Sequence, residues 1–173
     1  MTICDLGDIP INNPETDFNM VRQRVATLPN IPIMLGGDHS VSIPILQGQR
    51  ERYKDLRLGV LWVDAHPDLC DDFDGSHISH ANVMRRALEF GIEPHDVCMV
   101  GLRSWEEQEI DLIENSGIHV YTAASVAERG MRHVADSIRN ILNDCDAIHI
   151  SLDIDCLDPS AAPGTGIPEF GGL

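Results

Sequence analysis

The sequence predicts an α/β fold of three layers, in which helices cover both faces of a mostly parallel sheet. Short apolar runs rich in β-branched residues alternate along the chain with longer segments of helical periodicity. Each apolar run has the length of a strand and is bounded by polar or turn residues. This alternation is typical of βα units, whose parallel strands are buried on both faces.

The individual elements follow from the same pattern. Strands are expected at Ile31–Leu35, Leu58–Val63, Val97–Leu102, Ile118–Tyr121 and Ala147–Asp153. Helices are expected at Asp17–Leu28, Val41–Tyr53, His80–Phe90, Trp105–Asn115 and Met131–Asn143. Gly91 and Gly117 are placed to cap two of these helices at their carboxyl ends. The polar stretch Asp68–Ser79 is expected to form a long loop after a strand, where open parallel sheets bind ligands.

Length and composition indicate one globular domain over residues 1–173. The chain is 43% hydrophobic and 23% charged, and its longest apolar runs are only strand-sized. The N-terminus lacks the basic and apolar regions of a signal peptide, so a cytoplasmic protein is expected. The five cysteines form no CxxC pair, which indicates free thiols.

The chain is strongly acidic, with 28 acidic against 12 basic residues and a formal charge of −16. This charge argues against nucleic acid and anionic membranes as partners. It is compatible with cationic substrates, with bound cations, or with an acidic surface that has no ligand.

Candidate metal ligands gather at the carboxyl ends of three expected strands. Asp64 and His66 lie two residues apart on extended chain, as do Asp153 and Asp155, so each pair can face one centre. Asp68 returns toward the first pair through a turn after Pro67. The full set of candidates is His39, Asp64, His66, Asp68, Asp153 and Asp155.

Four carboxylates and two imidazoles form an oxygen-rich donor set that suits Mn²⁺ better than structural Zn²⁺. The set is too large for one catalytic zinc and fits two metal ions that share carboxylates and activate a solvent molecule. Taken alone, any one of these residues is explained as a cap, a turn former or a solvated group. Together, crowded acids repel one another and require cations.

These segments resemble the ureohydrolase family, which includes arginase and agmatinase. The motifs Gly-Gly-Asp-His-Ser, Asp-Ala-His-x-Asp and Ser-x-Asp-x-Asp-x-x-Asp-Pro occur in order at Gly36–Ser40, Asp64–Asp68 and Ser151–Pro159. The segment Ala162–Glu169 looks like the loop that follows the last ligand in the family. The resemblance implies an arginase-like three-layer fold that is incomplete, because family members extend beyond both Asp5 and Leu173.

The resemblance also implies residue roles. One Mn²⁺ would be bound by His39, Asp64, Asp68 and Asp153, and the other by Asp64, His66, Asp153 and Asp155, with Asp64 and Asp153 bridging. His80 would be the active-site histidine, with His77 as a competing candidate. The leaving amine would take the proton that it needs from Asp68 or through His80. Family members form trimers or hexamers, so a homo-oligomer is expected.

The implied reaction is hydrolysis of a small cationic guanidino substrate to urea and an amine. The stretch Ser79–Glu89 looks closer to agmatinase than to arginase, so agmatine is the expected substrate, giving putrescine for polyamine biosynthesis. The acidic run Asp71–Asp74 either attracts the amine or is merely solvated. The glutamate with which the family grips the guanidinium has no counterpart here, and Glu169 is not expected to replace it.

Three alternatives stay open at this point. The first is another amidinohydrolase of the family, acting on a guanidino acid or a formimino compound. The second is a chain that retains metal without catalysis and serves as a binding module. The third is a dinuclear phosphoesterase, which needs basic groups for phosphate near the ligands, whereas this region is acidic apart from Arg85, Arg86 and Arg103.

Overall fold

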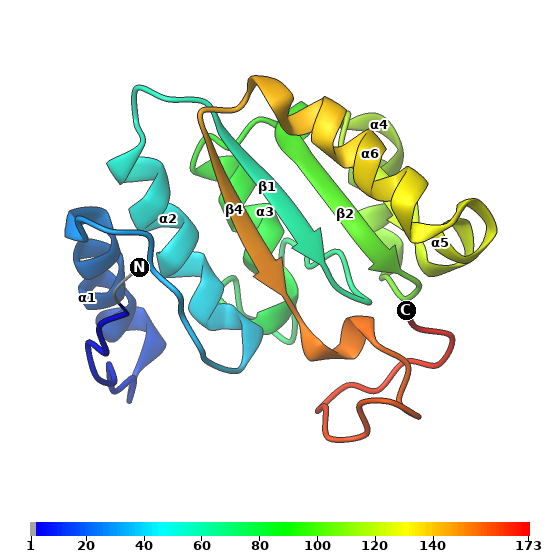
Figure 1. Ribbon diagram of the computed structural model, residues 1–173. Coiled ribbons are helices and arrows are strands. Elements are labelled where there is room, and N and C mark those ends of the chain that lie inside the picture. Colours follow the sequence, from blue (N-terminus) through cyan, green and yellow to red (C-terminus); the bar gives the residue numbers. More distant parts are fainter. Residues whose placement is uncertain (1–2) are drawn as a thin grey trace.

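A four-stranded parallel sheet forms the centre of the computed structural model, which describes residues 3–173 (Figure 1). Its strands are β1 (Leu58–Val63), β2 (Val97–Leu102), β3 (His119–Thr122) and β4 (Ala147–Leu152), in the order β3-β2-β1-β4. Val63 pairs with Val100 of β2 on one side and with Leu152 of β4 on the other. The carboxyl ends of these three strands therefore meet at one edge of the sheet. Met1 and Thr2 of the expected domain lie outside the described residues.

Helices cover both faces of this sheet, as the sequence predicts (Figure 1). Side chains of α2 (Ser42–Arg52), α3 (Val83–Glu89) and α4 (Ile110–Asn115) pack on one face around the fully buried Trp62. Side chains of α5 (Ala123–Arg129) and α6 (Met131–Ile141) pack on the other face against Val100. Helix α1 (Pro14–Thr27) lies outside α2, and Val21 and Val25 join it to Ile45. The three-layer α/β class is thus confirmed.

Short 3-10 helices connect these elements and carry much of the site. They are η1 (His39–Val41), η2 (His80–Asn82), η3 (Pro94–Asp96), η4 (Glu107–Glu109), η5 (Leu142–Asp144) and η6 (Ile154–Cys156). Three of them form an end turn of a predicted helix, since η2 directly precedes α3, η4 directly precedes α4 and η5 directly follows α6. The predicted helices therefore differ from the observed ones mainly in how tightly their end turns are wound.

Local capping explains several element boundaries. Helix α1 begins before the predicted Asp17, because the Asn13 side chain accepts a 3.0 Å hydrogen bond from the Glu15 amide and Pro14 fits the first turn. Gly91 and Gly117 follow α3 and α4 with φ values of 89° and 96°, which confirms both predicted caps. Within residues 3–173, every helix is too short or too polar to cross a bilayer. All five cysteines are free, as predicted.

Two parts of the fold differ from the prediction. The segment Ile31–Leu35 is not a strand, and Ile31, Ile33 and Leu35 are 82–96% exposed. Its periodicity suits a strand, but no strand in residues 3–173 pairs with it, and Pro32 has no amide to donate to a ladder. Helix α5 was not among the predicted elements. It begins where the Thr122 side chain accepts a hydrogen bond from the Ser125 amide.

Strand β4 is an edge strand in the described part of the chain. Its residues alternate, so that His149 and Ser151 are buried on the side of the main core whereas Ile148, Ile150 and Leu152 are 49–71% exposed on the other side. The carboxyl end of β4 places Asp153 beside Asp64.

Candidate metal centre

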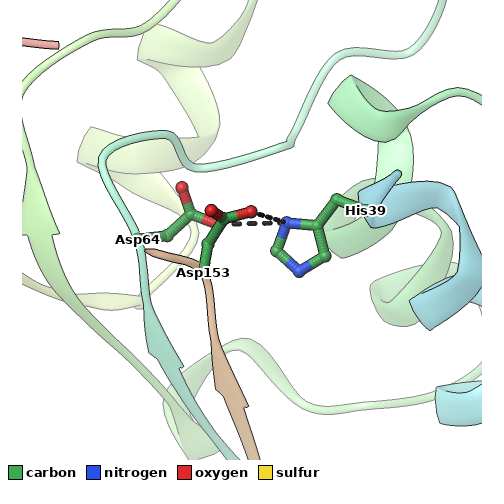
Figure 2. Close-up of side chains that lie close together, drawn as sticks. All are labelled: His39, Asp64 and Asp153. Carbon is green, nitrogen blue, oxygen red and sulfur yellow. Dashed lines mark ion pairs between the residues drawn. The ribbon is translucent and has the colours of Figure 1, made fainter. Parts of the chain in front are cut away.

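His39 forms the first half of the site together with three carboxylates. It opens η1, whose start is capped by the Asp38 side chain accepting from the Ser40 amide at 2.9 Å. The His39 Nδ1 atom lies 3.1 Å from Asp64 Oδ2 and 3.2 Å from both Asp68 Oδ2 and Asp153 Oδ2. Figure 2 shows Asp64 and Asp153 converging on this nitrogen from the ends of neighbouring strands. One ring nitrogen carries at most one hydrogen, so it cannot satisfy three carboxylates at once.

The second half of the site is built from Asp64, His66 and Asp155. The His66 Nδ1 atom lies 3.1 Å from Asp155 Oδ2 and 3.6 Å from Asp64 Oδ1. The other Asp155 oxygen accepts a 3.1 Å hydrogen bond from the Ala65 amide, which ties η6 to the end of β1. On its far side, the His66 Nε2 atom lies 3.7 Å from Glu169 Oε1.

The histidines carry the charge that balances the buried acids. Burial lowers the pKa of His39, but the neighbouring carboxylates of Asp153, Asp64 and Asp68 outweigh it and raise the pKa to about 12. In the same way, Asp155 and Asp64 overcome burial and raise the pKa of His66 to about 10. Burial itself raises the pKa of Asp68 to about 7. Binding of a metal ion by these residues would require the histidine ligands to lose their ring protons.

The donor set fits divalent cations on its own geometry. Ligand atoms of His39, Asp64 and Asp153 lie within 4.8 Å of one another, and so do those of Asp64, His66 and Asp155. Asp64 belongs to both groups. The buried Oδ2 atoms of Asp64 and Asp68 have no hydrogen-bond partner within residues 3–173, which leaves electron pairs for a cation. Carboxylate oxygens with two imidazoles are donors that Mn²⁺ and related divalent metals accept.

Asp68 is held in place by its backbone. Its φ of 52° lies in the left-handed region, which is uncommon for a residue other than glycine. Its carbonyl oxygen accepts from the amides of Met84 and Arg85 at 2.9 and 3.1 Å, in the first turn of α3, where helix amides lack internal partners. The next amide, that of Leu69, donates to the buried carboxylate of Glu109 at 2.6 Å. These contacts direct the Asp68 side chain toward His39.

Trp62 and Ser151 orient the His39 ring. The Trp62 ring stacks on His39 with centroids 4.3 Å apart and planes 3° from parallel, and its Nε1 donates to the His66 carbonyl at 3.1 Å. Ser151 Oγ lies 3.1 Å from His39 Nε2 and so fixes the second ring nitrogen. Trp62 is not among the residues that the sequence singled out for the site. Its position two residues before Asp64, on the same side of β1, was the available signal.

The candidate catalytic histidine His80 opens η2, a turn that contacts η1, which carries His39. The His80 ring packs edge-on against Phe73 at a centroid distance of 5.2 Å. His80 is partly buried, whereas the side chain of His77 is 61% exposed. The His77 Nδ1 atom lies 2.7 Å from the carbonyl oxygen of Asp71. The acidic run is also largely engaged, since Asp71 pairs with Arg86 at 2.6 Å and Asp72 accepts from the Gly75 amide at 2.9 Å.

Fold and site together define an α/β protein with a carboxylate–histidine centre for divalent metal at the carboxyl ends of parallel strands. The comparisons with known proteins agree with this class. The model of the Arginase family matches residues 1–173. The chain belongs to the Arginase family.

Individual relatives include enzymes of both branches. An arginase from Bacillus subtilis (strain 168) is 35% identical over an alignment 204 residues long, which covers 99% of this chain and 68% of that protein. An agmatinase from the same strain is 32% identical over an alignment 180 residues long, which covers 100% of this chain and 58% of the agmatinase. A crystal structure of the Bacillus subtilis arginase superposes with a TM-score of 0.88 at 35% identity, covering 99% of this chain and 67% of that one.

The chain thus spans 58–68% of the length of these curated relatives. The two identities, 35% to the arginase and 32% to the agmatinase, do not separate the branches. The expected preference for agmatine accordingly stays a prediction.

Proposed function

We propose that this chain hydrolyses a guanidinium compound to urea and an amine at a centre of two Mn²⁺ ions. The observation that carries the proposal is the pair of ligand groups that share Asp64 at the carboxyl ends of β1 and β4. Membership of the Arginase family supports it. The candidate ligands are mostly carboxylate oxygens, with two histidine nitrogens and no cysteine sulfur among them, and this donor set favours Mn²⁺ over Zn²⁺.

The proposed ligands of one ion are His39, Asp64, Asp68 and Asp153. The three carboxylates lie 3.1–3.2 Å from the His39 Nδ1 atom. Those of the other ion are Asp64, His66, Asp153 and Asp155. Asp153 lies in the first group geometrically, and its assignment to both ions rests on family resemblance. Two bound divalent ions supply an activated water and neutralise charge that develops on the substrate.

The chain's own groups then manage the substrate and the proton. The acidic surroundings of the site favour a cationic guanidinium over anionic or neutral substrates. We assign Asp68 and His80 to proton transfer, because Asp68 is a buried acid at the centre and its carbonyl accepts from the Met84 amide, directly after the turn η2 that carries His80. The exposure of His77 makes it the weaker candidate for this role.

Agmatine is the substrate we propose, on the strength of the stretch Ser79–Glu89 that forms η2 and α3. The acidic run contributes less than expected, because Asp71 is paired with Arg86 and does not face the site as a free carboxylate. Arginine, or another guanidino or formimino compound, is the second candidate, and an arginase stands among the relatives at an identity similar to that of the agmatinase. We further propose that residues 1–173 form one domain and that the chain assembles into a homo-oligomer.

Urea release from the Mn²⁺-loaded chain tests the function. Agmatine, arginine and a guanidino acid are supplied in parallel, and D64N serves as the matched inactive control. Urea from agmatine alone supports the whole proposal, and urea from arginine alone retains the reaction while replacing the substrate. No urea from any substrate, with two Mn²⁺ bound per chain, contradicts the proposed catalysis and favours the metal-retaining binding module.

A further inference from the structure

Arg103 connects the segments that carry the second ligand group. It directly follows β2, and its backbone amide donates to the Ala65 carbonyl at 2.9 Å, between Asp64 and His66. Ala65 in turn donates its amide to the Asp155 carboxylate. The main chain of Arg103 is therefore fixed against the β1 end of the site before its side chain makes any contact.

The guanidinium of Arg103 reaches over to the other side of the same group. Its Nη2 atom donates to the carbonyls of Asp155 at 2.5 Å and Glu169 at 2.8 Å, with longer contacts to Leu157 at 3.3 Å. Its Nη1 atom donates to the carbonyls of Gly101 at 3.1 Å and Cys156 at 3.3 Å. One side chain thus joins the end of β2, the η6 turn and the Glu169 segment.

These contacts are specific to one half of the site. Every acceptor lies on β2, on η6 and the residue after it, or on the Glu169 segment. His39 and Asp68 are held separately, by Trp62, by Ser151 and by the first turn of α3. Loss of Arg103 should therefore loosen Asp155 and its distance to His66 while leaving the His39 group in place.

We propose that Arg103 is a positioning residue that sets the Asp155 turn against His66 and thereby determines affinity for the second metal ion. This inference rests on the proposed function for its metal. The fork of the guanidinium is required, since its donors lie in one plane and can reach carbonyls from three segments at once. A lysine ammonium keeps the charge but concentrates its donors on a single nitrogen.

The test compares R103Q and R103K with the wild type and with R57Q. Arg57 is the matched control because it also makes several hydrogen bonds, but to Asp96 at the opposite end of the sheet. Mn²⁺ titration followed by electron paramagnetic resonance distinguishes a coupled ion pair from a single ion. The wild type and R57Q should bind a coupled pair, even if R57Q melts at a lower temperature.

In R103Q the first Mn²⁺ should bind as in the wild type and the second about 10–100-fold more weakly, the usual effect of losing a group that orients a ligand. R103K should recover only part of this loss. Equal binding of both ions in R103Q and the wild type would overturn the inference, as would equal weakening of both ions.

A second readout needs no metal. Hydrogen exchange in the metal-free chain should be faster in R103Q than in the wild type at the amides of Ala65 and of Asp155–Leu157, and unchanged there in R57Q. Unchanged exchange in R103Q would overturn the positioning role. Failure of the wild type to bind a second Mn²⁺ would instead refute the proposed dinuclear function, so the two failures can be told apart.

Discussion

Replacement of Asp64 by Asn should abolish stabilisation by Mn²⁺ altogether, because the Asp64 carboxylate lies in the ligand group of His39 and in that of His66. A ligand present at 100 times its dissociation constant stabilises a folded protein by about 2.7 kcal/mol per site, so two sites give about 5 kcal/mol. For a chain of this size, each kcal/mol raises the melting temperature by about 2–4 °C. The wild type should therefore melt about 10–20 °C higher with Mn²⁺ than with a chelator.

The partial variant gives the sharper comparison. D155N removes a ligand from the second group only and should keep about half of the shift, whereas D64N should keep none. D136N, which alters an exposed acid on α6, is the control and should shift like the wild type. Scanning calorimetry with Mn²⁺ and with chelator measures all four chains. A full shift in D64N would refute the shared-ligand geometry, and so would an absent shift in the wild type.

Three further predictions concern other parts of the molecule. Hydrogen bonds from Arg57 hold the pKa of Asp96 below its usual value, so this pair stabilises the fold above pH of about 4 and less at lower pH. R57Q should accordingly lower the melting temperature of the metal-free chain at pH 7 and by less at pH 3. G48A should lower the free energy of unfolding in urea by about 1–3 kcal/mol, since a Cβ there would lie 2.5 Å from a carbonyl oxygen of α1. H80A should lower kcat at least about 100-fold with Mn²⁺ retained, whereas H77A should leave kcat unchanged.

Much of the fold and the core of the candidate site could be predicted because the information is local. The strand Leu58–Val63 was placed with its observed bounds, since an apolar run between polar residues has few other solutions. The same run fixes the direction of Asp64 and His66 at its end. Parallel pairing then brings Asp153 beside Asp64, as the βα alternation implied.

What could not be predicted depends on contacts between residues far apart in the sequence. Glu109 binds the amide of Leu69, 40 residues away, and Arg103 binds carbonyls more than 50 residues away. The hydrophobic periodicity of the sequence contains no information about such long-range hydrogen bonds. The prediction of a strand at Ile31–Leu35 was wrong for the same reason. A strand forms only where a neighbouring strand completes its hydrogen bonds, and the local sequence does not specify that neighbour.

Two divalent ions should bind at the carboxyl ends of β1 and β4. A crystal structure of the chain grown with Mn²⁺, with anomalous diffraction measured at the manganese edge, would locate both ions. Two anomalous peaks are expected, one against His39, Asp64 and Asp153 and the other against Asp64, His66 and Asp155. A single peak, or two peaks of which neither touches Asp64, would refute the dinuclear centre.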